Sequence, residues 1–263
     1  MARKLILIAA AGIGLGIVSI AAAAVVAGPD LSKIDWENLN IGFDRCEKVD
    51  GATATSRTLD WTGGDRITIA VPGEAHYRPG DNQAIQVSGD PNSIAHLRLR
   101  HHTLEFDCNG LHRGKLDITL PGRTFRSFAV AGSGNLTLEQ IDQPSLDVTV
   151  AGSGTVKSSG KADQIKIKIA GSGTIEASGQ ADTVDLVIAG SGDARLGELQ
   201  AKIADINIAG SGDAEVAPQD IAKIKIAGSG NVRLVTNPKD LDTRIFGSGR
   251  ILHGPAGSVE DRP

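Results

Sequence analysis

The sequence predicts an all-β protein whose main part, residues 126–252, is a single-stranded parallel β-helix, that is, a β-solenoid with coils of about 19 residues. Three observations support this prediction: seven Gly-Ser-Gly triplets at nearly constant spacing, apolar residues at alternate positions before each triplet, and no helix-like apolar pattern in that stretch. A repeat of this length, built only from strands and turns, fits one coil of a β-helix.

The triplets mark the corners of the predicted coils. Six copies read Ala-Gly-Ser-Gly and the seventh reads Phe-Gly-Ser-Gly; their serines are 20, 19, 19, 20, 18 and 19 residues apart. These serines are Ser133, Ser153, Ser172, Ser191, Ser211, Ser229 and Ser248. Glycine allows the unusual φ angles and the close contact between coils that a corner requires. Seven equivalent serines are poor candidates for a single nucleophile, so the triplet is interpreted as structural.

Apolar and charged residues recur at fixed distances from each serine. Alternation with a period of two is typical of a strand with one buried face, so the residues three and five before each serine should point into the core. The residues three before are Val130, Val150, Ile169, Ile188, Ile208, Ile226 and Ile245. The charges four residues after the serine alternate in sign, as Lys157, Glu176, Arg195, Glu215 and Arg233. Stacked parallel strands favour this alternation because neighbouring like charges repel, and the row is interpreted as a solvated outer face.

The residues before the solenoid form a predicted N-terminal cap. Residues 45–125 contain short alternating runs separated by turns, of which Asp90-Pro91 is one, but no repeat. A cap is needed because an open coil end leaves a strand edge that promotes aggregation. Residues 29–44 are assigned to a linker and residues 253–263 to a polar tail.

The N-terminus is typical of an exported protein. Arg3 and Lys4 precede an apolar, uncharged stretch, residues 5–28. This pattern fits a signal peptide, and the stretch is also long enough to span a bilayer as a helix. Residues 1–28 are therefore either a cleaved signal peptide or a retained transmembrane anchor. Both interpretations place the rest of the chain outside the cytoplasm, in the periplasm or cell envelope, either released or anchored in the inner membrane.

The two cysteines are expected to pair. An exported chain with an even number of cysteines favours a disulfide, here between Cys46 and Cys108. His101, His102 and His112 lie near Cys108, but their spacing matches no zinc pattern. We therefore predict a structural disulfide, no metal site at these histidines and no cofactor.

The combined features resemble a known family. An irregular β block, the entry segment Leu120-Pro121-Gly122 and the repeated Ala-Gly-Ser-Gly turns make residues 45 to 252 similar to the "putative auto-transporter adhesin, head GIN domain" family of bacterial envelope proteins. The resemblance implies a right-handed β-helix in the cell envelope and supplies no functional residues. The chain departs from the pattern in the seventh copy, at Phe246 and Arg250.

Catalytic motifs are missing from the sequence. The triplet is neither the G-x-S-x-G nucleophile elbow nor a dinucleotide-binding loop. Polysaccharide-acting β-helix enzymes need clustered carboxylates and aromatic platforms, which the predicted solenoid lacks apart from one acidic pair. Asp193 and Asp213, two residues after consecutive serines, should lie one coil apart and form a candidate cation site, with solvated turn acids as the alternative.

The sequence favours a non-enzymatic, adhesin-like binding scaffold of the cell envelope. The alternative is a membrane-anchored regulatory or assembly component that docks another envelope protein, and an enzyme acting on polysaccharides is the third interpretation. The expected partner is an envelope protein or a glycan, with membrane contact through residues 5–28. A net charge of −4 argues against nucleic-acid binding, which needs a basic surface.

Overall fold

The computed structural model describes residues 46–108 and 114–254. They belong to one compact unit, residues 42–263. The signal peptide or anchor expected in residues 1–28, the linker in 29–44, His112 and nearly all of the polar tail lie outside the described residues. Within the described ranges, no helix is both long enough and apolar enough to cross a membrane.

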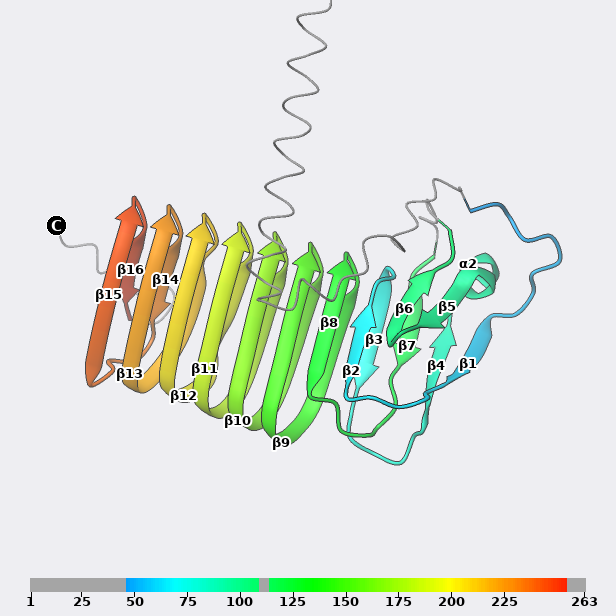
Figure 1. The fold of residues 1–263 in the computed structure, drawn as a ribbon, viewed down its shortest axis with the longest axis horizontal. Coiled ribbons are helices and arrows are strands. Elements are labelled where there is room, and N and C mark those ends of the chain that lie inside the picture. Colours follow the sequence, from blue (N-terminus) through cyan, green and yellow to red (C-terminus); the bar gives the residue numbers. More distant parts are fainter. Residues whose placement is uncertain (1–45, 109–113, 255–263) are drawn as a thin grey trace, which may run out of the picture. The chain divides into compact units, whose positions relative to one another are not determined.

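The solenoid is a stack of parallel strands, as predicted (Figure 1). Every coil-to-coil pairing from β8 onward is parallel. Its strands are β8 (Ser127–Gly132), β9 (Asn135–Gly152), β10 (Thr155–Gly171), β11 (Thr174–Gly190), β12 (Asp193–Gly210), β13 (Ala214–Gly228), β14 (Asn231–Leu234), β15 (Asp240–Gly247) and β16 (Arg250–His253). We call the segments that lead into the triplets the long face and those that follow the triplets the short face. The right-handed sense of the coils stays a prediction.

The core consists of aliphatic rows in which equivalent residues of successive coils pair. Ile169 pairs with Val150 on one side and with Ile188 on the other, and all three are fully buried. Burying one such side chain stabilises the fold by roughly 1.5–3 kcal/mol, so each coil depends on the next for its stability. The predicted inward positions are confirmed, but Ile245, in the last coil, is 40% exposed because no further coil covers it.

The triplets form tight corners for a backbone reason. The first glycine adopts a positive φ, +127° at Gly190, where a side chain would be strained. The second glycine is buried, and a Cβ on Gly192 would lie 2.5 Å from Cγ2 of Ile169 and 2.6 Å from the carbonyl oxygen of Gly173. The serine between them is exposed, and the backbone N–H of Ser191 donates to the oxygen of Gly171 at 2.9 Å. The corner is therefore structural.

The unequal triplet spacing is explained by bulges on the short face. In the first 20-residue step, β9 carries one residue more than β10 next to Gln140, whose φ is +56°. In the second 20-residue step, the segment of β12 that lies opposite Glu176–Ser178 of β11 is one residue longer than that segment. The next step has only 18 residues, because β13 lacks residues at the place where β12 has extra ones. Residues 197–199 of β12 therefore have no partner in β13 and form a bulge. Most of the length variation thus lies in the segments that follow the triplets, and one further register shift lies between Ala201 and Ile203 of β12, where β13 has one residue more.

The N-terminal block combines antiparallel and parallel strands. Its elements are β1 (Ser56–Asp60), β2 (Arg66–Ile69), β3 (Gly73–Tyr77), β4 (Ala84–Ser88), α2 (Pro91–His96), β5 (Leu97–Arg100), β6 (Thr103–Phe106) and β7 (Leu116–Thr119). The pairs β1–β4, β4–β7 and β5–β6 are antiparallel. Asp90-Pro91, interpreted from the sequence as a turn, begins helix α2: Asp90 caps it by accepting from the N–H of Ser93 at 3.0 Å.

Two strands of this block extend the solenoid by a coil that the sequence conceals. β2 pairs in parallel with β8, and β3 pairs in parallel with β9. The segment Val71-Pro72-Gly73 therefore occupies the place of a Gly-Ser-Gly triplet, with Glu74 opposite Asn135. A Cβ on Gly134 would lie 2.6 Å from the oxygen of Val71, so the first triplet packs closely on this segment, as later triplets pack on one another.

Candidate functional site: a charged groove on the short face

A groove of about 460 Å³ runs across the short face. It crosses β9 to β13 and is lined by residues of the segments 137–139, 157–159, 176–178 and 195–198, together with Glu215. These are the residues that follow the triplets in five consecutive coils. Because the strands are stacked in register, the groove has a repeating wall with one residue of each row per coil.

Three members of the predicted charge ladder form ion pairs between coils in this groove; Glu215 also lines it, and Arg233 is not among the lining residues. The ammonium group of Lys157 lies 3.1 Å from Oε2 of Glu176, and the guanidinium of Arg195 lies 2.8 Å from Oε1 of the same carboxylate. The hydrogen bond from Lys157, and then that from Arg195, lowers the pKa of Glu176, although partial burial opposes the shift. Glu176 therefore stays ionised between two cations, whose side chains are 62% (Lys157) and 61% (Arg195) exposed.

The bulge in β12 lines the groove at one end. Gly197 lies in the bulge, and the carboxylate of Glu215 from the next coil packs directly over it, since a Cβ on Gly197 would lie 2.2 Å from Oε1 of Glu215. Glu198 is exposed beside it. At the other end Arg78 of the N-terminal block pairs with Glu139 at 2.6 Å. The groove thus presents carboxylates at both ends and an alternating ladder between them.

The position two residues after each serine, considered above for cation binding, has a hydrogen-bonding role in two coils. The side-chain oxygen of Asn135 accepts from the N–H of Thr155 at 3.2 Å, and Oδ1 of Asp213 accepts from the N–H of Asn231 at 2.7 Å. Asp193 lies one coil before Asp213, as the spacing predicted, and its carboxylate is 4.0 Å from the guanidinium of Arg195. A cation between the two aspartates stays a prediction.

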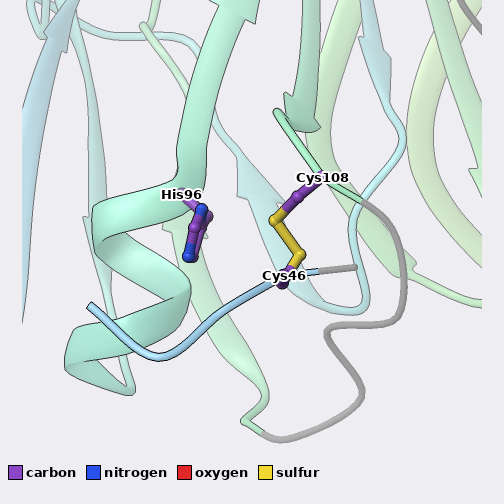
Figure 2. Close-up of side chains that lie close together, drawn as sticks. All are labelled: Cys46, His96 and Cys108. Carbon is purple, nitrogen blue, oxygen red and sulfur yellow. A yellow bond between two sulfur atoms is a disulfide. The ribbon is translucent and has the colours of Figure 1, made fainter. Parts of the chain in front are cut away.

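The two cysteines are joined, as expected (Figure 2). Cys46 and Cys108 form a disulfide with a Cα–Cα distance of 5.0 Å, which ties the start of the described chain to the segment after β6. Figure 2 also shows His96, at the end of α2, beside this bridge. Its two ring nitrogens lie 2.8 Å from Oδ1 of Asp107 and 2.9 Å from the backbone oxygen of Glu47.

The cysteine and histidine atoms lie close enough to hold a metal ion, within 4.8 Å of one another. In the structure, however, the sulfurs are bonded to each other and both nitrogens of His96 have protein partners, so the cluster is a structural brace. From the sequence, no metal site was predicted at His101, His102 or His112. In the structure, His102 packs against Trp61 with ring centroids 5.3 Å apart and the rings tilted by 45°. His96 is 12 residues from Cys108, and only the fold of α2 brings it to the bridge.

A comparison with protein-family models now identifies the chain's relatives. The model described as "Putative auto-transporter adhesin, head GIN domain" matches residues 65–238. The chain belongs to this family. The match starts just before β2, so it includes the concealed coil and the groove together with most of the N-terminal block. A comparison with curated protein sequences found no match.

Solved structures with the same fold include proteins from Bacteroides fragilis and from two Parabacteroides species. A structure described as a putative adhesin from Bacteroides fragilis has a TM-score of 0.66 at 19% identity, covering 75% of this chain and 95% of that one. A structure described as a putative lipid binding protein from Parabacteroides distasonis has a TM-score of 0.59 at 23% identity, covering 76% and 96%. A putative adhesin from Parabacteroides merdae has a TM-score of 0.55 at 16% identity, covering 76% and 95%. At these identities the likeness shows the fold alone.

Proposed function

We propose that this head GIN domain protein is an exported, non-enzymatic binding scaffold of the cell envelope, and that the groove on its short face holds a polypeptide segment of another envelope protein. The observation that carries the proposal is the ladder of Lys157, Glu176 and Arg195, whose charged groups pair with one another in a row along an open groove. A row of alternating charges of this kind recognises a partner by charge complementarity.

The chemistry of the groove favours a polypeptide over a glycan. None of the residues that line it is aromatic, and binding of sugars commonly uses aromatic stacking. The groove offers cations, carboxylates and the hydroxyls of Ser158, Ser159 and Ser178 within one repeating wall. Peptides carry charges of both signs and backbone donors and acceptors, which match such a wall.

Export is supported by the disulfide between Cys46 and Cys108 and by the family. Disulfides persist in oxidising compartments and are rare in the cytosol. Mass spectrometry of the mature N-terminus, combined with cell fractionation, separates a released protein that has lost residues 1–28 from one that keeps them as an anchor. Recovery of the uncleaved chain in the cytosolic fraction would contradict export.

Photo-cross-linking in cells tests the groove. A photoreactive amino acid at Ser178 in the groove should cross-link to a protein, whereas one at Lys166 on the exposed long face should not. Reversing the central charge with Glu176→Lys should reduce the cross-linked product about fivefold, since it opposes the partner's charge by about 1 kcal/mol. The matched reversal Lys166→Glu should leave it unchanged. Cross-links that form equally from both positions, or only to glycan, would overturn the proposal.

A further inference from the structure

The C-terminal end of the solenoid exposes a strand edge. β15 pairs with β13 and with no other described strand, and all eight of its residues are exposed. Its apolar side chains include Leu241 at 38%, Ile245 at 40% and Phe246 at 72% exposure. In every earlier coil the residues equivalent to Leu241 and Ile245 are covered by the next coil. Such an edge favours pairing with another strand.

The free backbone groups of β15 follow from the register. The N–H of Ser248 donates back to the oxygen of Gly228 at 2.9 Å. In a parallel pair, alternate residues direct their N–H and C=O groups toward opposite neighbours. Ser248 directs its N–H toward the preceding coil, so residues an odd number of positions before it direct their N–H and C=O groups the other way. The backbone groups of Leu241, Thr243 and Ile245 therefore face the open edge. These three residues are also the ones whose side chains continue the core rows.

The sequence of β15 is complementary to itself in one antiparallel register. When Thr243 faces Thr243 of a second copy, Asp242 faces Arg244 and Leu241 faces Ile245, each contact occurring twice. The residues with free backbone groups form the hydrogen-bonded pairs, and Asp242 and Arg244 form the non-hydrogen-bonded pairs, where side chains lie closest. Backbone, core and charge requirements are thus satisfied together.

The adjacent registers are unfavourable. Centring the pair on Asp242 places two aspartates face to face on the symmetry axis, and centring it on Arg244 places two arginines there. Like charges directly opposite each other destabilise a strand pair. The register centred on Thr243 is therefore selected by charge as well as by apolar matching.

We propose that the protein forms a tail-to-tail dimer in which β15 pairs antiparallel with β15 of a second copy, centred on Thr243. The two solenoid cores become continuous through Leu241 and Ile245, and Asp242 and Arg244 form ion pairs across the interface. The assembly is closed, since the interface uses the same surface of both copies and the opposite end of each solenoid carries the N-terminal block. The dimer places two charged grooves on one rigid body.

Charge reversal tests the proposed register. Sedimentation velocity over a concentration series should show a dimer for the wild type, and Asp242→Arg or Arg244→Asp alone should weaken association at least about tenfold, because each places like charges opposite each other twice. The double variant D242R/R244D restores opposite charges and should recover most of the association. Circular dichroism checks that each variant is folded. A monomeric wild type, or a double variant no better than the single ones, would overturn the proposal.

Cross-linking tests the position of the axis. The protein's two cysteines are already paired, so Thr243→Cys adds the sole free thiol. Opposed residues of a hydrogen-bonded antiparallel pair lie about 5.5 Å apart, within the range of a disulfide. Mild oxidation should therefore give a covalent dimer from Thr243→Cys, whereas Ser229→Cys, exposed at the preceding corner, should remain monomeric on denaturing gels. Equal cross-linking from both positions, or a wild type whose edge is covered by its own residues 255–263 and stays monomeric, would contradict the dimer.

Discussion

The two ends of the solenoid are built in opposite ways. At the N-terminal end the edge strand β1 pairs with β4, the guanidinium of Arg57 in β1 donates to the backbone oxygen of Leu97 at 2.8 Å, and helix α2 contacts the same strand. Behind it Phe125 packs against Trp61, Tyr77 and Phe128. At the C-terminal end β15 has neither a helix nor an antiparallel strand over it among the described residues.

This difference shows how a repeat protein controls its growth. A coil is stable only against a neighbour, so both ends of a stack are weak points. The N-terminal end is sealed by residues that break the repeat and by the bridge between Cys46 and Cys108. The C-terminal end keeps the repeat and changes only a few residues, which suits association with a partner rather than closure.

The largest expected effect on stability comes from comparing the loss of one aromatic side chain at each end of the solenoid. Phe125→Ala should lower the free energy of unfolding by about 4 kcal/mol, because Phe125 is fully buried and its removal leaves a cavity. Phe246→Ala, which gives the seventh triplet the preceding alanine that the other six have, should change it by less than about 0.5 kcal/mol. Urea unfolding of the dilute monomer measures both. Similar losses for the two variants would contradict the contrast between the ends.

A second comparison uses the same substitution in a middle coil and in the last coil. Gly192→Ala should destabilise by about 2 kcal/mol, because its Cβ would overlap the preceding coil while the following coil prevents a shift. Gly249→Ala produces the same overlap with Gly230, but the last coil is free to move away, so we expect less than about 1 kcal/mol. Thermal or urea unfolding checks the order. If Gly249→Ala were the more harmful change, the last coil would be as tightly held as the middle ones.

The smallest effect concerns the ladder that runs between the ends. The pKa of Glu176 is lowered by Lys157 and Arg195, so its ionised form stabilises the fold above the unfolded value of about 4.5, and this contribution is lost as the pH falls through the lowered pKa. Glu176→Gln should therefore cost about 0.5 kcal/mol at pH 7 and nothing below both pKa values. Urea midpoints at pH 7 and at strongly acidic pH measure the difference. A cost that is independent of pH would mean that packing, and not charge, holds the ladder.

Much of the solenoid was predictable because its repeat is spelled out residue by residue. The triplets gave the corners, the alternation gave the buried rows, and the even cysteine count gave the disulfide. The coil made by β2 and β3 was not predictable, because Val71-Pro72-Gly73 replaces the triplet and only strand pairing shows the equivalence. Helix α2 was also missed, since the six residues Pro91–His96 are too few to show a helical period.

The groove could not be predicted from local sequence patterns. The ladder of Lys157, Glu176 and Arg195 was visible in the sequence and was interpreted as a solvated face. The unequal triplet steps were also visible, but nothing in them indicated which corner carries the extra residues. The structure places extra residues of β12 on the short face, beside the ladder, and both the bulge and the ladder line the groove.

By itself, the sequence determined the repeating backbone, because Gly-Ser-Gly corners and aliphatic alternation act within one coil and its neighbour. Only the tertiary structure decided the two ends and the groove, since these depend on which segments meet across coils: Val71-Pro72-Gly73 on the first triplet, His96 on the disulfide, and Glu215 over Gly197. A periodic sequence specifies contacts between equivalent residues of successive coils. The groove and the two ends form where segments that are not equivalent meet.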